Sequence, residues 1–110
     1  MKPEIKNKWI KALKSGKYKQ GTNTLKTIDG KYCCLGVLCK LYGQEKGVNW
    51  RKRGTSNYFL DECSYLPSAV QEWAGLTDNN PKAGDNVLSL LNDKEKYDFG
   101  KIADEIEKTL

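Results

Sequence analysis

The sequence predicts a single small α+β domain over residues 1–110, with about three main helices and a small antiparallel sheet. Two observations predict this class. Apolar residues recur at helical spacing near both ends of the chain, and an almost wholly apolar stretch, 33–43, lies between them. With 110 residues, of which 38% are hydrophobic, the chain can bury one core and has no room for a second domain.

The two terminal helices are expected from apolar stripes and end signals. The first covers 3–15, with Pro3 in its first turn and Gly16 just past its end. The last begins at Asp98, whose carboxylate can cap it. Its apolar stripe consists of Phe99, Ile102, Ala103, Ile106 and Leu110.

The middle of the chain predicts two more helices. The stretch 33–43 favours a central buried helix closed by Gly43, in which Gly36 allows another segment to approach closely. A shorter helix is expected within 66–76, with Pro67 in its first turn.

The sheet is expected from one hairpin and one short apolar run. Asp29-Gly30 predicts a two-residue type I′ turn inside a ribbon over 24–32. Residues 87–91 are interpreted as a strand that pairs with this ribbon. The connection 44–63 is predicted to be irregular, and a connection of that length in a small domain is usually functional or mobile.

Charge is divided unequally between the two halves of the chain. Residues 1–53 hold twelve lysines and two arginines against three acids, a net charge of +11, whereas 54–110 hold five lysines against eleven acids, a net charge of −6. Either the halves neutralise each other on folding, or the basic half keeps a face that attracts phosphate. The sequence leaves both interpretations open.

Catalytic groups are scarce. The chain has no histidine, which removes the usual general base near neutral pH and the commonest zinc ligand. The cysteines offer no paired metal ligands, because the side chains of adjacent Cys33 and Cys34 diverge on a helix or a strand. We therefore expect a protein that is not an enzyme and that holds no cofactor and no metal.

The best candidate site combines cations and aromatic rings in two loops. Its residues are Lys17, Tyr18, Lys19, Gln20, Trp50, Arg51 and Arg53. Phosphate favours arginine or lysine, a base favours a ring to stack on, and an amide can bond to a base edge. The alternative is that these loops are solvated surface and that Trp50 anchors the core.

Several sequence words occur in the order seen in one group of proteins. They are Trp9-Ile10-x-Ala12-Leu13-x-Ser15-Gly16-x-Tyr18-x-Gln20-Gly21, Tyr32-Cys33-Cys34-Leu35-Gly36-Val37-Leu38-Cys39, Leu66-Pro67 with Trp73-Ala74-Gly75-Leu76, and Leu91-Asn92-Asp93 with Phe99 and Ile102-Ala103. In these words the chain resembles small, mostly uncharacterised proteins encoded by bacteriophages and prophages. The resemblance implies an accessory protein that acts on host machinery, and it assigns no catalytic residue.

Together these observations predict a non-enzymatic phage accessory protein that antagonises a host process by binding an anionic nucleotide ligand, such as an immune signal. One alternative is a nucleic-acid-binding protein that uses the basic N-terminal half. Another is a protein inhibitor that docks on a host enzyme.

The expected location is the cytoplasm of the host cell, without membrane contact. No apolar run reaches the ~18 residues that a membrane-spanning helix needs, and the first residues have no hydrophobic stretch of signal-peptide type. A small basic binder often works as a homodimer, so a homodimer is a further expectation.

Overall fold

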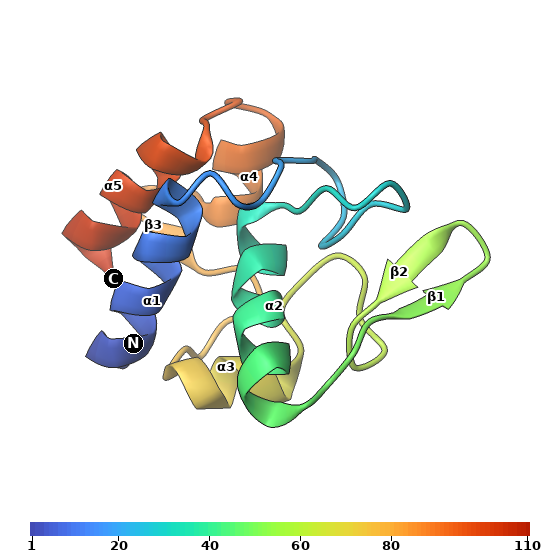
Figure 1. The fold of residues 1–110 in the computed structure, drawn as a ribbon. Helices are drawn as coiled ribbons and strands as arrows, with labels where there is room; N and C mark the ends of the chain where they lie inside the picture. Colours follow the sequence, from blue (N-terminus) through green and yellow to red (C-terminus); the bar gives the residue numbers. More distant parts are fainter.

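The computed structural model describes residues 1–110 as five helices and two small antiparallel sheets (Figure 1). The helices are α1 (Pro3–Lys14), α2 (Cys34–Lys46), α3 (Ser68–Ala74), α4 (Leu88–Asp93) and α5 (Phe99–Thr109). The strands are β1 (Arg51–Arg53), β2 (Ser56–Tyr58), β3 (Lys82–Ala83) and β4 (Asn86–Val87), paired β1 with β2 and β3 with β4. The predicted α+β class is confirmed, with five helices instead of about three. None of these helices has the length and apolar composition needed to cross a bilayer.

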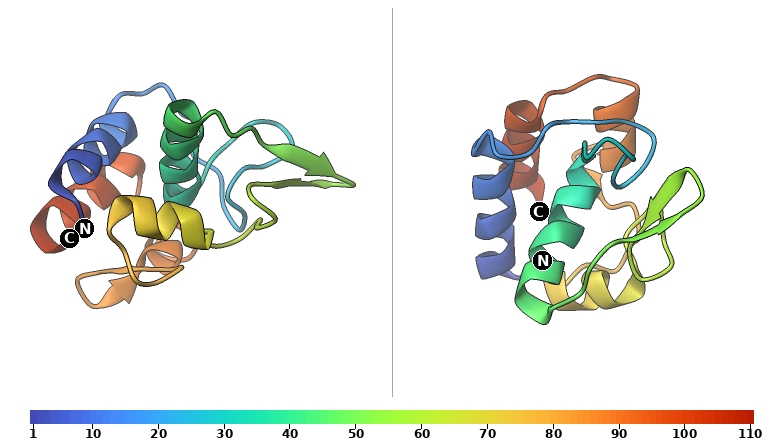
Figure 2. Two further views of the ribbon diagram at one scale, coloured as in Figure 1. Left: turned by 90° about the horizontal axis from the view of Figure 1, so that it is seen from below. Right: turned by 45° about the vertical axis from the view of Figure 1, so that its right-hand side comes forward.

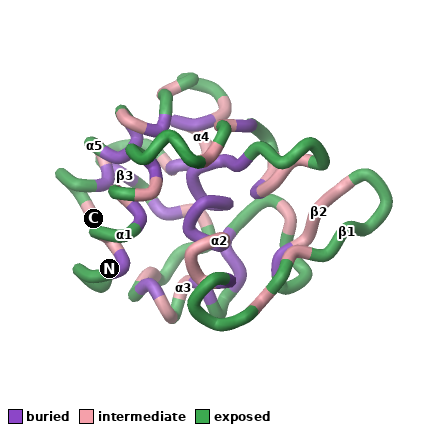
Figure 3. Tube along the Cα trace, viewed as in Figure 1, coloured by how far each residue is buried: buried purple, intermediate pink, exposed green.

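Helix α2 forms the centre of the molecule, and its first six residues, 34–39, are all buried (Figure 3). The sequence predicts that this helix ends at Gly43, but it continues to Lys46 and ends at Gly47, whose φ of 70° is left-handed. Gly43 is required inside the helix because a Cβ there would lie 2.5 Å from the Val48 carbonyl oxygen. Its glycine therefore reflects close packing and not a helix end.

Helices α1 and α5 pack antiparallel against each other, and the two ends of the chain lie close together (Figures 1 and 2). Trp9 of α1 is fully buried, and its indole N–H donates to the Cys34 carbonyl oxygen at 3.0 Å. The predicted cap at Asp98 is confirmed, because its carboxylate accepts from the Lys101 backbone N–H at 2.8 Å. Both terminal helices thus follow from their sequence signals.

The ribbon predicted over 24–32 is wrong as a sheet, although a turn is present. Gly30 has a φ of 86°, but Asp29 does not share the positive φ that a type I′ turn needs at both central residues. The Thr27 N–H bonds to the Lys31 carbonyl at 2.8 Å, so three residues, not two, make the loop. A two-residue turn at Asp29-Gly30 would place Thr27 opposite Tyr32, whereas an isolated bridge pairs Lys26 with Tyr32.

The backbone of Tyr32 shows why no strand forms there. Its N–H donates to the Lys19 carbonyl at 2.8 Å, and its carbonyl accepts from the Gly21 N–H at 2.7 Å. These bonds tie Tyr32 to the loop after α1, and the chain enters α2 two residues later. Of the expected ribbon only an isolated antiparallel bridge between Lys26 and Tyr32 forms, beside the parallel bridge between Gln20 and Tyr32.

Residues 87–91, predicted as the partner strand, instead lead into helix α4. Leu88 and Leu91 are buried at helical spacing. The side-chain oxygen of Asn80 accepts from the Ser89 backbone N–H at 3.2 Å and supports the first turn. A five-residue apolar run suits a strand or a helix, and this contact from outside the run favours the helix.

The connection 44–63 is not irregular throughout, because it contains the β1–β2 hairpin, which projects from the body of the molecule (Figures 1 and 2). Arg53 pairs with Ser56, which leaves Gly54 and Thr55 as the turn. Gly54 has a φ of 59° and Thr55 does not have a positive φ, the pattern of a type II′ turn with glycine first. The basic residues 51–53 therefore lie on a strand with a defined alternation.

Candidate anion-binding site

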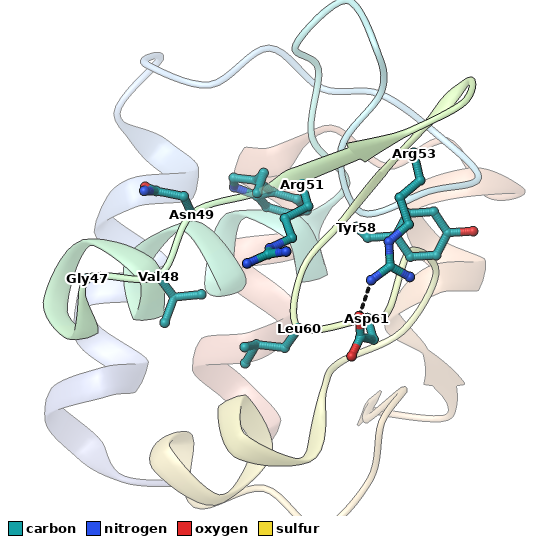
Figure 4. Close-up of a pocket in the computed structure, with 9 residues that line it drawn as sticks. Gly47, Val48, Asn49, Arg51, Arg53, Tyr58, Leu60 and Asp61 are labelled. Atoms are coloured by element: carbon teal, nitrogen blue, oxygen red, sulfur yellow. Dashed lines mark hydrogen bonds and ion pairs between the residues drawn. The ribbon is translucent and has the colours of Figure 1, made fainter.

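The base of the β1–β2 hairpin borders an open cavity of about 700 Å³, a volume typical of small-molecule sites (Figure 4). We call it the hairpin hollow. Its lining residues are Gly47, Val48, Asn49, Trp50, Arg51, Arg53, Tyr58, Leu60 and Asp61. Three of the predicted site residues, Trp50, Arg51 and Arg53, thus lie together.

Strand alternation decides which cations face the hairpin hollow. Arg51 and Arg53 are two residues apart on β1 and share one face, whereas Lys52 belongs to the opposite face. Arg51 is exposed, takes part in none of the ion pairs of the chain, and extends between Val48 and Leu60 (Figure 4). It is a free cation on the wall of the cavity.

Arg53, by contrast, is already paired. Its guanidinium bonds to the Asp61 carboxylate and lies 4.9 Å from the centre of the Tyr58 ring. Asp61 comes from a tight turn in which Leu60 and Asp61 have φ values of 48° and 71°. Left-handed conformations cost an L residue about 1–2 kcal/mol. This turn places the Asp61 carboxylate against the Arg53 guanidinium, so Arg51 is the arginine without an acidic partner.

Trp50 links the hairpin hollow to the core. Its ring lies 4.9 Å from that of Phe59 and 6.0 Å from that of Tyr32, between centroids. The ammonium of Lys26 lies 5.5 Å from the Trp50 ring centre. The indole N–H is buried without a hydrogen-bond partner. Every other buried side-chain nitrogen or oxygen has a partner. Such a donor costs about 1–3 kcal/mol, so an acceptor that reached it would strengthen binding.

The 17–20 loop lies apart from the hairpin hollow. Lys17 and Tyr18 line a second cavity of about 390 Å³ between α1 and α2, which we call the α1–α2 groove. The Tyr18 ring packs edge-on against the Tyr32 ring, with 5.4 Å between the centroids, and the Tyr32 ring packs in turn against that of Trp50. Aromatic packing therefore connects the 17–20 loop with Trp50, although the two line different cavities. Lys19 is exposed and lines neither cavity.

The contacts of Gln20 face inward. Its side-chain nitrogen donates to Asn92 Oδ1 at 2.9 Å and to the Tyr97 carbonyl at 2.8 Å. Both amide hydrogens are used in these bonds. These bonds fasten the loop of Gln20 to α4 and to the segment after it, and the contact of Gln20 with a base edge stays a prediction.

The basic half keeps most of its charge unpaired. Only two of its side chains pair with carboxylates of the acidic half, Lys14 with Asp104 at 2.9 Å and Arg53 with Asp61. The other three ion pairs form within 1–53. Of the two interpretations of the charge pattern, these contacts favour the open basic face.

The cysteines are free thiols and three of them, Cys33, Cys34 and Cys39, are buried. Burial raises the pKa of the Cys33 thiol to about 11 and raises the pKa of Cys34 and Cys39 well above its usual value. All three therefore stay protonated at neutral pH. No three side chains of metal-binding type gather at one point.

In the folded protein, we expect only half-buried Cys63 to react quickly with a thiol reagent, since the attacking species is an accessible thiolate. Titration with Ellman's reagent at neutral pH should give one fast equivalent, and all four thiols should react in guanidinium chloride. Cys63→Ser should remove the fast phase and leave the circular dichroism spectrum unchanged. Two or more fast equivalents in the native protein would contradict the burial described here.

Sequence reasoning missed the wall of the hairpin hollow formed by Tyr58, Leu60 and Asp61. The dipeptide Gly54-Thr55 between two short polar segments is a hairpin signal that could have placed Tyr58 opposite Arg51. No signal in the sequence places Asp61 on Arg53, because that contact depends on the left-handed turn.

Comparison with known proteins gives one family and no characterised relative. A family model described as a domain of unknown function (DUF8296) matches residues 1–110. No curated protein and no solved structure matches the chain. The match includes the hairpin hollow and the α1–α2 groove, so both cavities lie within the region that this family model describes.

Proposed function

The chain belongs to the DUF8296 family, and we propose that it is a non-enzymatic binding protein that holds an anionic nucleotide in the hairpin hollow. The observation that carries this proposal is Arg51, an exposed guanidinium without an acidic partner on the wall of a cavity of about 700 Å³. A guanidinium matches the geometry of phosphate with two parallel hydrogen bonds. The rings of Trp50 and Tyr58 line the same cavity and suit a base.

A separate cavity of about 450 Å³ offers no comparable charge. Among its lining residues are one acid, Asp78, and one base, Lys82. Its walls therefore have no formal excess of positive charge to attract a phosphate. The comparison favours the hairpin hollow as the site for an anion.

Antagonism of a host process is the role that we propose for this binding, on the basis of the resemblance to bacteriophage proteins. A protein that holds a signalling nucleotide without converting it lowers the free concentration of that signal by mass action. Incubation with the bound nucleotide should therefore return it chemically unchanged, which chromatography of the released ligand would check.

Arg51→Ala should weaken nucleotide binding about tenfold or more, because a hydrogen bond to a charged group contributes about 1.5–3 kcal/mol. The free energy of unfolding should change by less than about 0.5 kcal/mol, since the side chain is exposed and unpaired. Isothermal titration against linear and cyclic nucleotides, from AMP and ATP to cyclic dinucleotides, would measure the first quantity. Urea unfolding would measure the second.

Lys52→Ala is the matched control, because Lys52 lies on the same strand, is also exposed, and faces away from the hairpin hollow. It should reduce affinity much less than Arg51→Ala. Arg51→Lys keeps the charge and removes the planar fork, so its affinity should lie between those of the wild type and Arg51→Ala. Equal losses for the two alanine variants, or no heat and no rise in melting temperature with any nucleotide, would refute the proposal.

A further inference from the structure

We infer that the hairpin hollow is one end of a track for a single-stranded oligonucleotide, which crosses α2 and ends in the α1–α2 groove. This inference rests on the proposed function and names the class of its ligand. Three features carry it: the continuity of the cavities, the free cations along them and the rings between those cations.

The three cavities adjoin one another through shared lining residues. A small hollow of about 80 Å³ lies between the two larger ones. It shares Gln44 with the α1–α2 groove, and it shares Val48, Asn49 and Trp50 with the hairpin hollow. A ligand could therefore pass from α1 over α2 to β1, which lie in that order across Figure 1.

Free cations follow the same line. Lys11 and Lys17 line the α1–α2 groove, Lys40 lines the small hollow, and Arg51 lines the hairpin hollow. None of the four takes part in an ion pair of the chain. Positive charge is thus available at every stage of the track, as a polymer of phosphates requires.

The acids beside the track are already engaged. The Glu45 carboxylate accepts from the Trp73 indole N–H at 2.6 Å and pairs with Lys8 at 3.6 Å. The Asp61 carboxylate pairs with Arg53. No acidic residue lines the α1–α2 groove or the small hollow. These pairs limit the repulsion that a polyanion would meet.

Aromatic rings and cavity sizes favour a single strand over a duplex. Tyr18 stands beside Lys17 in the groove and Trp50 beside Arg51 in the hairpin hollow, an arrangement typical of proteins that bind single strands. Rings of this kind stack on unpaired bases. The small hollow, of about 80 Å³, is the smallest of the three cavities, so we place a phosphate linkage there and the bases in the two larger cavities.

The test measures the fluorescence anisotropy of labelled octathymidylate. The affinity for the octamer is compared with that for thymidine monophosphate, the mononucleotide probe. We expect octathymidylate to bind at least tenfold more tightly than the mononucleotide. Lys17→Gln should weaken octathymidylate binding severalfold and leave mononucleotide binding at the hairpin hollow unchanged. The matched control is Lys19→Gln, because Lys19 is exposed in the same loop and lines none of the three cavities.

The salt dependence supplies a second readout. The slope of log affinity against log salt for the octamer should fall in magnitude by about 0.7 for each phosphate contact removed from a single strand. The magnitude of this slope should fall in Lys17→Gln and in Arg51→Ala, and it should stay nearly constant in Lys19→Gln. Equal changes in Lys17→Gln and Lys19→Gln would show that general charge, and not the track, attracts the strand.

The outcomes separate this inference from the proposed function. If octathymidylate binds no more tightly than the mononucleotide and ignores Lys17→Gln, the track is refuted while the nucleotide site at Arg51 stands. If neither probe binds, and no other nucleotide gives heat, both fail. If duplex DNA or polyglutamate displaces the octamer as well as unlabelled octathymidylate does, base stacking plays no part and the single-strand assignment is wrong.

Discussion

Gly36→Ala should destabilise the protein by about 3 kcal/mol or more, an effect at the upper end of those caused by overpacking. A Cβ at this position would lie 1.8 Å from the Leu25 carbonyl oxygen and 2.7 Å from the carbonyl carbon. The Leu25 backbone is held from two sides, since its carbonyl accepts from the Cys33 N–H at 3.2 Å and its N–H donates to the Cys63 carbonyl at 2.7 Å. It cannot yield without breaking one of these bonds.

The sign of this effect is diagnostic, because helix propensity alone favours alanine over glycine by about 1 kcal/mol. Gly100→Ala in α5 is the matched control, since the nearest atom to its Cβ would be the Asp98 side-chain oxygen at 3.4 Å, close to ordinary contact. Gly100→Ala should be neutral or stabilising in guanidinium unfolding followed by circular dichroism. Wild-type stability in Gly36→Ala would show that Leu25 does not press on α2 as described.

The close approach at Gly36 is an example of what the sequence alone could predict. Glycine has a low helix propensity, so its presence in the almost wholly apolar stretch 33–43 indicates close packing at that position. The terminal helices followed in the same way from apolar stripes and caps. The two sheets did not follow, because each is a local hairpin whose strands have only two or three residues, too few for an alternating pattern to be recognised. The ribbon that we expected over 24–32 failed for a different reason, since distant contacts decide that segment and Tyr32 bonds to Lys19 and Gly21.

The candidate site was predictable in composition and not in geometry. The basic stretch 51–53 and the neighbouring Trp50 point to an anion from residue types alone. Strand alternation decides that Arg51 and Arg53, and not Lys52, face the hairpin hollow, and the left-handed turn at Asp61 decides that Arg51 is the arginine without a partner. Neither is visible in the composition. The contacts of Gln20 were not predictable either, since no sequence pattern indicates that its amide hydrogens bond to Asn92 and to the Tyr97 carbonyl.

Asn92→Ala is expected to be the second severe change, with a loss of about 3 kcal/mol or more, because several buried groups lose their partners at once. Asn92 is 1% exposed. Its side-chain oxygen accepts from Gln20 Nε2 at 2.9 Å and from the Cys34 N–H at 3.2 Å, and its nitrogen donates to the Gly21 carbonyl at 2.9 Å. One side chain thus joins α4, the start of α2 and the loop after α1.

Asn92→Asp distinguishes this hydrogen-bond network from simple loss of volume, since the shapes of the two side chains are nearly the same. An ionised carboxylate would face the Gly21 carbonyl and the Asp93 side chain, so burial and repulsion would raise the pKa of the new acid above its value in the unfolded chain. Stability is then fullest below the unfolded pKa, near pH ~4, and is lost as the pH rises through the folded pKa. Thermal melts between pH 4 and 7, referenced to the wild type, should show this progressive loss for Asn92→Asp and a nearly pH-independent loss for Asn92→Ala. Parallel pH profiles for the two variants would mean that Asn92 fills space and that its hydrogen bonds do not hold the three segments together.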